Sequence, residues 1–159
     1  MELNVTQQSE TGESEKWHRT FAMSSNNRAW ELSVKSRGTA EDREMLCAAH
    51  ASAWHWEQTG NELNRMRAKM LLAEVHALLG FGSSAFTFAT EMRDYFLTRY
   101  TPDWEIAFTH VIYAHAAYAA GESMEHRSAY EKAIVAMRAI EDAEDQNVVS
   151  KTFDHVPAP

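Results

Sequence analysis

Apolar side chains recur along most of this chain at the spacing of one helix face. In one central stretch they fall three or four positions apart, at Leu63, Met66, Met70, Ala73 and Ala77. This spacing places side chains on the same side of an α-helix, whereas a half-buried strand requires strict alternation of apolar and polar residues. Such alternation does not occur over any comparable stretch, so the pattern predicts an all-α protein.

Glycine and a proline-containing turn divide this pattern into expected helices. Gly38, Gly80 and Gly121 each end an apolar stripe, which is a common role of glycine after the last helical residue. The run Thr101-Pro102-Asp103 predicts a helix start, with a threonine cap, proline at the first position and an acid in the first turn. The expected helices cover residues 17–37, 39–60, 61–79, 82–96, 103–120, 122–140 and 141–156.

Short connections between these segments predict how the helices pack. Links of a few residues force neighbouring helices to lie antiparallel, so the chain is expected to form a row of helical hairpins. With 159 residues it has the length of one domain. Residues 6–15, by contrast, are almost entirely polar. We therefore expect a flexible leader over residues 1–15 and a single helical domain over residues 16–156.

Two of the glycines follow the same arrangement of large and small residues. One set is Leu72, Ala73 and Gly80, and the other is Tyr113, Ala114 and Gly121. A small residue lets two helices cross closely, and the large one beside it fills the remaining space. Over residues 61–140 this arrangement resembles the tetratricopeptide repeat, although the two glycines lie further apart than that repeat's period of about 34 residues. The resemblance implies antiparallel hairpins stacked as a short right-handed superhelix of about six or seven helices.

A longer stretch is similar to a family of small bacterial helical proteins with no assigned activity. The residues that carry the likeness are Ala49-His50-Ala51-Ser52, His55-Trp56, Gly60, Asn64, Arg67, Leu79-Gly80, Asp103-Trp104-Glu105-Ile106-Ala107-Phe108 and Ile140-Glu141-Asp142. At Met70 the chain departs from the family, which tends to carry tryptophan there. The resemblance implies a helical fold and no catalytic residue.

The charge of the chain disfavours two classes of partner. Its formal net charge of −8 repels phosphate backbones and anionic lipid, which bind clusters of lysine and arginine. The longest uncharged run, residues 106–121, is shorter than the roughly 20 apolar residues that a membrane span requires. We therefore expect neither a nucleic-acid partner nor insertion into a membrane.

A single cysteine bears on the compartment of the protein. Cys47 has no second cysteine with which to form a disulfide bond within the chain, and a zinc site with several cysteines is excluded. The first residues lack the basic and apolar regions of a signal peptide. These features predict a cytoplasmic protein.

The eight histidines are the residues that most suggest chemistry. His50 and His55 are five positions apart, as are His110 and His115, which turns each pair about 140° around a helix axis. Neither pair can hold a metal ion from one helix. One hypothesis is therefore a small-molecule- or metal-binding enzyme whose site between helices uses His55, His76, His110 and His115. The alternative is that each imidazole is buried and hydrogen-bonded to a neighbouring helix.

The leading hypothesis from the sequence is a non-enzymatic module that binds a protein or peptide. Stacked hairpins leave a concave face, here expected from residues 61–79 and 103–120. The residues expected to be exposed on that face are Asn64, Arg67, Glu74, His76, Glu105 and His110. Their charges and hydrogen-bonding groups suit a peptide backbone and its charged ends. No cofactor is expected.

Three consecutive large side chains, Trp54, His55 and Trp56, cannot all face one core. At least one of them is expected to point toward a groove, a second chain or solvent, and aromatic anchors are typical of protein interfaces. A short stack of hairpins also tends to leave a terminal apolar face uncovered. A homodimer is therefore a third hypothesis.

Overall fold

The computed structural model describes the backbone of residues 3–159 and the side chains of residues 12–159. Within this part of the chain the secondary structure consists of seven helices and no strand, which confirms the all-α prediction. The helices are α1 (Leu3–Ser33), α2 (Thr39–Thr59), α3 (Glu62–Leu78), α4 (Gly82–Leu97), α5 (Asp103–Ala120), α6 (Ser123–Arg138) and α7 (Ala143–Phe153). From α2 onward each helix matches an expected one, with ends that differ by a few residues.

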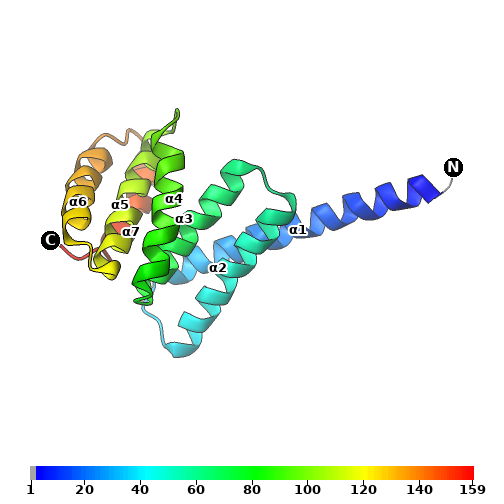
Figure 1. Ribbon diagram of the computed structural model, residues 1–159, viewed down its shortest axis with the longest axis horizontal. Helices are drawn as coiled ribbons and strands as arrows, with labels where there is room; N and C mark the ends of the chain where they lie inside the picture. Colours follow the sequence, from blue (N-terminus) through cyan, green and yellow to red (C-terminus); the bar gives the residue numbers. More distant parts are fainter. Residues whose placement is uncertain (1–2) are drawn as a thin grey trace.

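Neighbouring helices pack against one another as three successive hairpins. α1 lies against α2, α3 against α4 and α5 against α6, and α7 closes the row against α5 (Figure 1). The odd-numbered helices also contact one another in order, α1 with α3, α3 with α5 and α5 with α7. A row of hairpins whose first helices touch is the arrangement of a helical-repeat stack.

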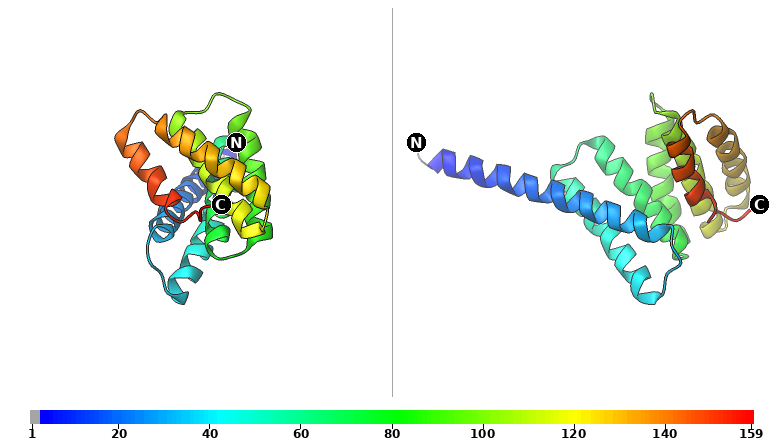
Figure 2. Two further views of the ribbon diagram at one scale, coloured as in Figure 1. Left: turned by 90° about the vertical axis from the view of Figure 1, so that its left-hand side faces the viewer. Right: turned by 180° about the vertical axis from the view of Figure 1, so that it is seen from behind.

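Helix α1 is longer than the sequence pattern predicted. Its N-terminal turns extend away from the other helices, before His18 meets His55 of α2 (Figures 1 and 2). The boundary expected after residue 15 is therefore not a boundary of secondary structure, because the helix continues through it to Ser33. Flexibility of the leader stays a prediction.

Gly80 and Gly121 end helices where the pattern placed them, whereas Gly38, expected to end the first helix, lies after the end of α1 at Ser33 and precedes α2 as its N-cap. Gly80 and Gly121 adopt φ angles of 76° and 77°, in the left-handed region that glycine enters without strain. α5 starts at Asp103, and Pro102, which was predicted to occupy the first helical position, is the N-cap residue instead. The predicted role of Thr101 as the cap of α5 is wrong. Its hydroxyl instead donates to the carbonyl oxygen of Phe96 at 2.7 Å, and so caps the end of α4.

Helix α3 lies between two groups of buried side chains. On one side, Leu71, Leu72 and Val75 pack with residues of α1 and α2. On the other side, Met70 and Ala73 pack with residues of α4, α5 and the helices that follow. The second half of α3 is therefore buried all round.

Helix α5 is also enclosed by its neighbours. Apart from His110, its residues 107–117 are buried, because α3, α4, α6 and α7 pack around it. Burial within the protein thus explains the uncharged run in the sequence. Among the helices of residues 3–159, none combines the length and the apolar character that crossing a bilayer requires.

Candidate functional site

The residues expected on a concave face do not form an exposed surface. Only 1% of Glu74, 8% of His76 and 2% of Glu105 is exposed to solvent. The prediction that these three side chains face solvent is wrong, because other helices enclose α3 and α5 on most sides. Their polar atoms take part in contacts between helices.

Arg67 and Glu105 join α3 to α5 by a two-point ion pair. Nε and Nη2 of Arg67 lie 2.7 and 3.2 Å from the two carboxylate oxygens of Glu105. The guanidinium carbon also lies 5.7 Å from the ring centre of Trp104, within range of a cation–π contact. A bidentate pair fixes both side chains and occupies both carboxylate oxygens. Asn64 is occupied as well, since it exchanges two capping hydrogen bonds with Asn61.

Glu74 of α3 and His115 of α5 form a second buried contact. Nδ1 of His115 lies 3.1 and 3.0 Å from the two oxygens of the Glu74 carboxylate. Burial by itself lowers the pKa of His115, but the charge of Glu74 and its hydrogen bond together outweigh burial and raise that pKa. The contact therefore favours a protonated imidazole, and it connects the two central helices.

Two pairs of histidines join α2 to its neighbours. Nδ1 of His55 lies 2.9 Å from Nδ1 of His18 on α1. Nε2 of His50 lies 3.1 Å from Nε2 of His76 on α3. Burial first, and the neighbouring imidazole second, lower the pKa of His55 and of His76. A lowered pKa keeps these two rings uncharged at neutral pH. A charged imidazole has no nitrogen left to accept a hydrogen bond, so one ring of each pair must be neutral.

The four histidines of the metal-enzyme hypothesis, His55, His76, His110 and His115, are not brought together. Three of them are each bonded to a different partner outside the set, and the fourth, His110, lies in a groove beside α6. Within the described residues, no group of three or more histidine, cysteine or carboxylate side chains is arranged to hold a metal ion. The structure therefore does not assemble the convergent site that this hypothesis required.

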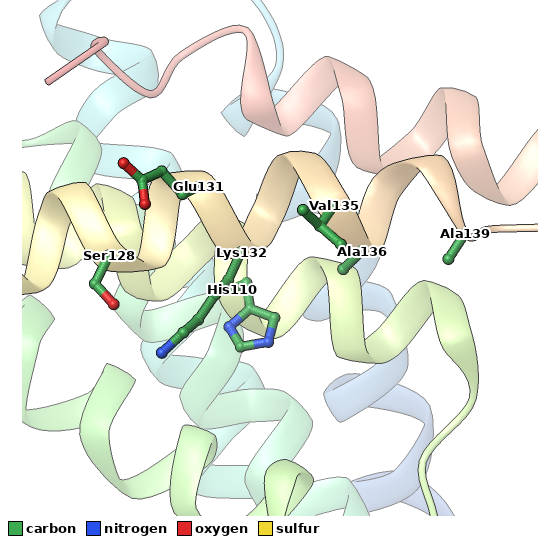
Figure 3. A pocket seen from close by; sticks show the side chains of 7 residues that line it. All are labelled: His110, Ser128, Glu131, Lys132, Val135, Ala136 and Ala139. Carbon is green, nitrogen blue, oxygen red and sulfur yellow. The ribbon is translucent and has the colours of Figure 1, made fainter.

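The groove beside α6 has a volume of about 400 Å³. Apart from His110, its lining comes from α6 and the residue that follows it: Ser128, Glu131, Lys132, Val135, Ala136 and Ala139. Figure 3 shows the imidazole of His110 next to the side chain of Lys132, with the valine and the alanines further along α6. Chemically, the groove offers one cationic group, Lys132, and one anionic group, Glu131, beside a small apolar surface.

His110 is expected to titrate far below an ordinary histidine. Burial, followed by the positive charges of Lys132 and Arg93, lowers its pKa from 6.5 to about 4. Because the pKa is lower in the folded chain than in the unfolded chain, this group increasingly favours unfolding as the pH falls from about 6.5 to about 4. NMR titration of the ring protons measures the midpoint, which should rise in a Lys132→Met variant. A wild-type midpoint near 6.5 would contradict this assignment.

Exposed aromatic side chains gather where α1 passes the second half of α2. Trp17, Phe21 and Trp54, which we call the aromatic patch, are 51%, 46% and 57% exposed. The rings of Trp17 and Phe21 stack with their centres 5.8 Å apart. Two histidines bridge the α1 and α2 sides of the patch. The ring centre of His18 lies 5.3 Å from that of Trp54, and the ring centre of His55 lies 5.4 Å from that of Phe21. All five side chains line a hollow of about 510 Å³.

Sequence reasoning located part of this patch. It predicted that one of Trp54, His55 and Trp56 would leave the core, and the exposure of Trp54 confirms this, while Trp56 is buried. It did not place Trp17 and Phe21 beside Trp54, because the first two lie on α1 and the third lies on α2, and spacing along the chain does not show how two helices pack. The four-residue spacing of Trp17 and Phe21 puts both on one face of α1, and this is the signal that points to them.

Known proteins give no functional assignment for this chain. No protein-family model, curated protein sequence or solved structure matches it. The resemblances to the tetratricopeptide repeat and to a family of small bacterial helical proteins therefore stay predictions. Any function has to follow from the geometry of the exposed and buried groups.

Proposed function

We propose that this protein is a non-enzymatic module that binds another protein through the aromatic patch. The observation that carries the proposal is the exposure of Trp17, Phe21 and Trp54 around one hollow. A monomeric fold rarely exposes large apolar side chains together, and aromatic residues contribute most of the binding energy in many protein interfaces. The stack of helices gives this surface a rigid support.

The chemistry of the patch favours an apolar segment of the partner, such as one face of a helix. The hollow is lined mainly by aromatic rings, and the carboxylate of Glu13 and the hydroxyl of Ser14 lie among its lining residues. On the N-terminal side of the patch, α1 extends beyond α2, which leaves length along which a partner helix can lie (Figure 1). An amphipathic helix binds such a surface through residues spaced three or four positions apart.

Other classes of function have less support. The net charge of −8 disfavours nucleic acid and anionic membranes. Three of the four histidines of the enzyme hypothesis are bonded to separate partners, and the fourth, His110, lies apart from them in the groove beside α6. Cys47 is exposed and free. Because such a thiol persists best in a reducing compartment, we include a cytoplasmic location in the proposal.

Photo-crosslinking in cells tests this proposal. A Trp54→p-benzoylphenylalanine variant is expected to form a covalent adduct with a second protein on irradiation. The matched control carries the same group at Tyr100, which is 96% exposed but lies outside the patch. Replacing Trp17 and Phe21 with serine in the crosslinking chain should remove the adduct, and should change stability little because both side chains are half exposed.

The identity of the adduct separates the hypotheses. An adduct with a different protein, formed from position 54 and not from position 100, supports the proposal. An adduct that contains only peptides of this chain would instead identify a homodimer that uses the same surface. Equal adducts from both positions, or none from position 54, would contradict a binding role for the aromatic patch.

A further inference from the structure

Two imidazole nitrogens face each other between α2 and α3 at the distance found in a metal chelate. Nε2 of His50 and Nε2 of His76 are 3.1 Å apart. A divalent ion bound to two imidazoles at about 2.0–2.1 Å holds their nitrogens about 2.8–3.4 Å apart, depending on whether the angle at the metal is square or tetrahedral. We propose that His50 and His76 form a binding site for a divalent transition-metal ion such as Zn²⁺. This proposal is independent of the protein-binding function.

The hydrogen bonds around His76 determine which of its nitrogens is available. Ser84 donates its only hydroxyl proton to the carbonyl oxygen of Phe81, at 3.2 Å. Nδ1 of His76 lies 2.7 Å from Oγ of Ser84, and the tautomer in which Nδ1 donates to that oxygen satisfies both contacts of Ser84. In this tautomer Nε2 of His76 is unprotonated and can accept a hydrogen bond from Nε2 of His50, 3.1 Å away. Metal-binding histidines have the same arrangement, in which one nitrogen donates to an orienting group and the other coordinates the ion.

The two rings differ in their access to solvent. His76 is 8% exposed, and the rings of Phe81 and Phe88 pack edge-on against it at centre distances of 5.7 and 5.4 Å. His50 is exposed on the surface of α2. The buried ring therefore provides a fixed ligand, and the exposed ring gives an ion a route from solvent.

Metal binding at this site needs a single proton shift. Without metal, and in the His76 tautomer that donates to Ser84, His50 donates a hydrogen bond from Nε2 to Nε2 of His76. For both Nε2 atoms to coordinate, the ring proton of His50 moves to its Nδ1 through the surrounding water, and the ring stays neutral. Water molecules complete the coordination shell, because no third histidine, cysteine or carboxylate among the described residues joins the pair.

The other histidine pair is a weaker candidate. The Nδ1 atoms of His18 and His55 are also close, at 2.9 Å. Among the described residues, however, no hydrogen bond orients the second nitrogen of either ring. An orienting bond such as that between His76 and Ser84 typically changes metal affinity by about 10–100-fold. The site at His50 and His76 is therefore expected to bind an ion first.

Calorimetric titration of the tag-free protein with ZnCl₂ at about pH 7.5 tests the proposal. The wild type is expected to bind one Zn²⁺ per chain, and a His50→Gln variant is expected to lose this binding. His50 is exposed, so this substitution leaves the fold intact, which circular dichroism checks. A Ser84→Ala variant should bind about 10–100-fold more weakly. The matched control, His18→Gln, should bind Zn²⁺ as the wild type does.

Three outcomes would overturn the assignment: no binding by the wild type, unchanged binding by His50→Gln, or loss of binding in His18→Gln. Acidification should weaken Zn²⁺ binding, since protons compete with the metal for the imidazole nitrogens. The His50→Gln variant keeps the aromatic patch, so crosslinking from position 54 and Zn²⁺ binding report separately on the two proposals.

Discussion

Replacing His115 with alanine is expected to lower the free energy of unfolding by about 3–5 kcal/mol. The substitution leaves the carboxylate of Glu74, which is 1% exposed, without its partner between α3 and α5. The carboxylate must then stay charged in a buried site or take up a proton, and both cost free energy. For a chain of this length the loss corresponds to a fall in melting temperature of roughly 6–20 °C. Urea and thermal unfolding followed by circular dichroism measure it.

A double substitution removes both buried charges and keeps the space between α3 and α5 filled. When Glu74 and His115 both become leucine, no buried charge remains, and exchanges of this kind are often neutral or stabilising. The double variant is therefore expected to be more stable than His115→Ala. If the two variants were equally unstable, an unpaired carboxylate would not be the cause of the loss.

The second large effect is expected at Gly82, the first residue of α4. A Cβ atom at this position would overlap the carbonyl oxygen of Ala119 and would lie 2.8 Å from Cα of Ala120, both backbone atoms of α5. Backbone atoms cannot rotate out of the way as a side chain can. Gly82→Ala is therefore expected to push α4 away from α5 and to lower the free energy of unfolding by about 1–3 kcal/mol or more. Chemical denaturation measures the difference.

A glycine in open space provides the control for this substitution. A Cβ atom at Gly12 in α1 would meet no other atom within 4 Å. Alanine favours a helix interior over glycine by about 0.8–1.0 kcal/mol, so Gly12→Ala should not destabilise the protein. Similar losses at Gly12 and Gly82 would argue against the close approach of α4 and α5.

The ends of most helices could be predicted because their signals are local. Gly80 and Gly121 end helices since a positive φ costs glycine little, and Asp103 begins one directly after a proline. Helix α1 was the exception. Residues 6–15 have no apolar stripe, and periodicity alone does not separate a helix that projects into solvent from a flexible leader.

The candidate site residues were harder to predict because their partners lie far away in the sequence. Glu74 contacts His115, which follows it by 41 positions. A lone acid in a helical segment is usually exposed, so the sequence favoured solvent for Glu74. Apolar periodicity marks a helix with one buried face, whereas the second half of α3 is buried all round. Only the packing of α5 against α3 shows how the polar groups there are satisfied.

The position of α3 between two groups of buried side chains sets the free-energy cost of detaching the first hairpin, α1 and α2, from the rest of the chain. In an extended repeat array each unit contacts only its neighbours, so one end can fray while the rest stays folded. Here, separating α1 and α2 from the rest would expose Leu71, Leu72 and Val75, while Met70 and Ala73 on the same helix stayed packed against the later hairpins. The first hairpin, α1 and α2, thus packs on α3, and the later hairpins hold α3 in place. Fraying at this end therefore leaves the later hairpins folded, at the free-energy cost of exposing those three apolar side chains.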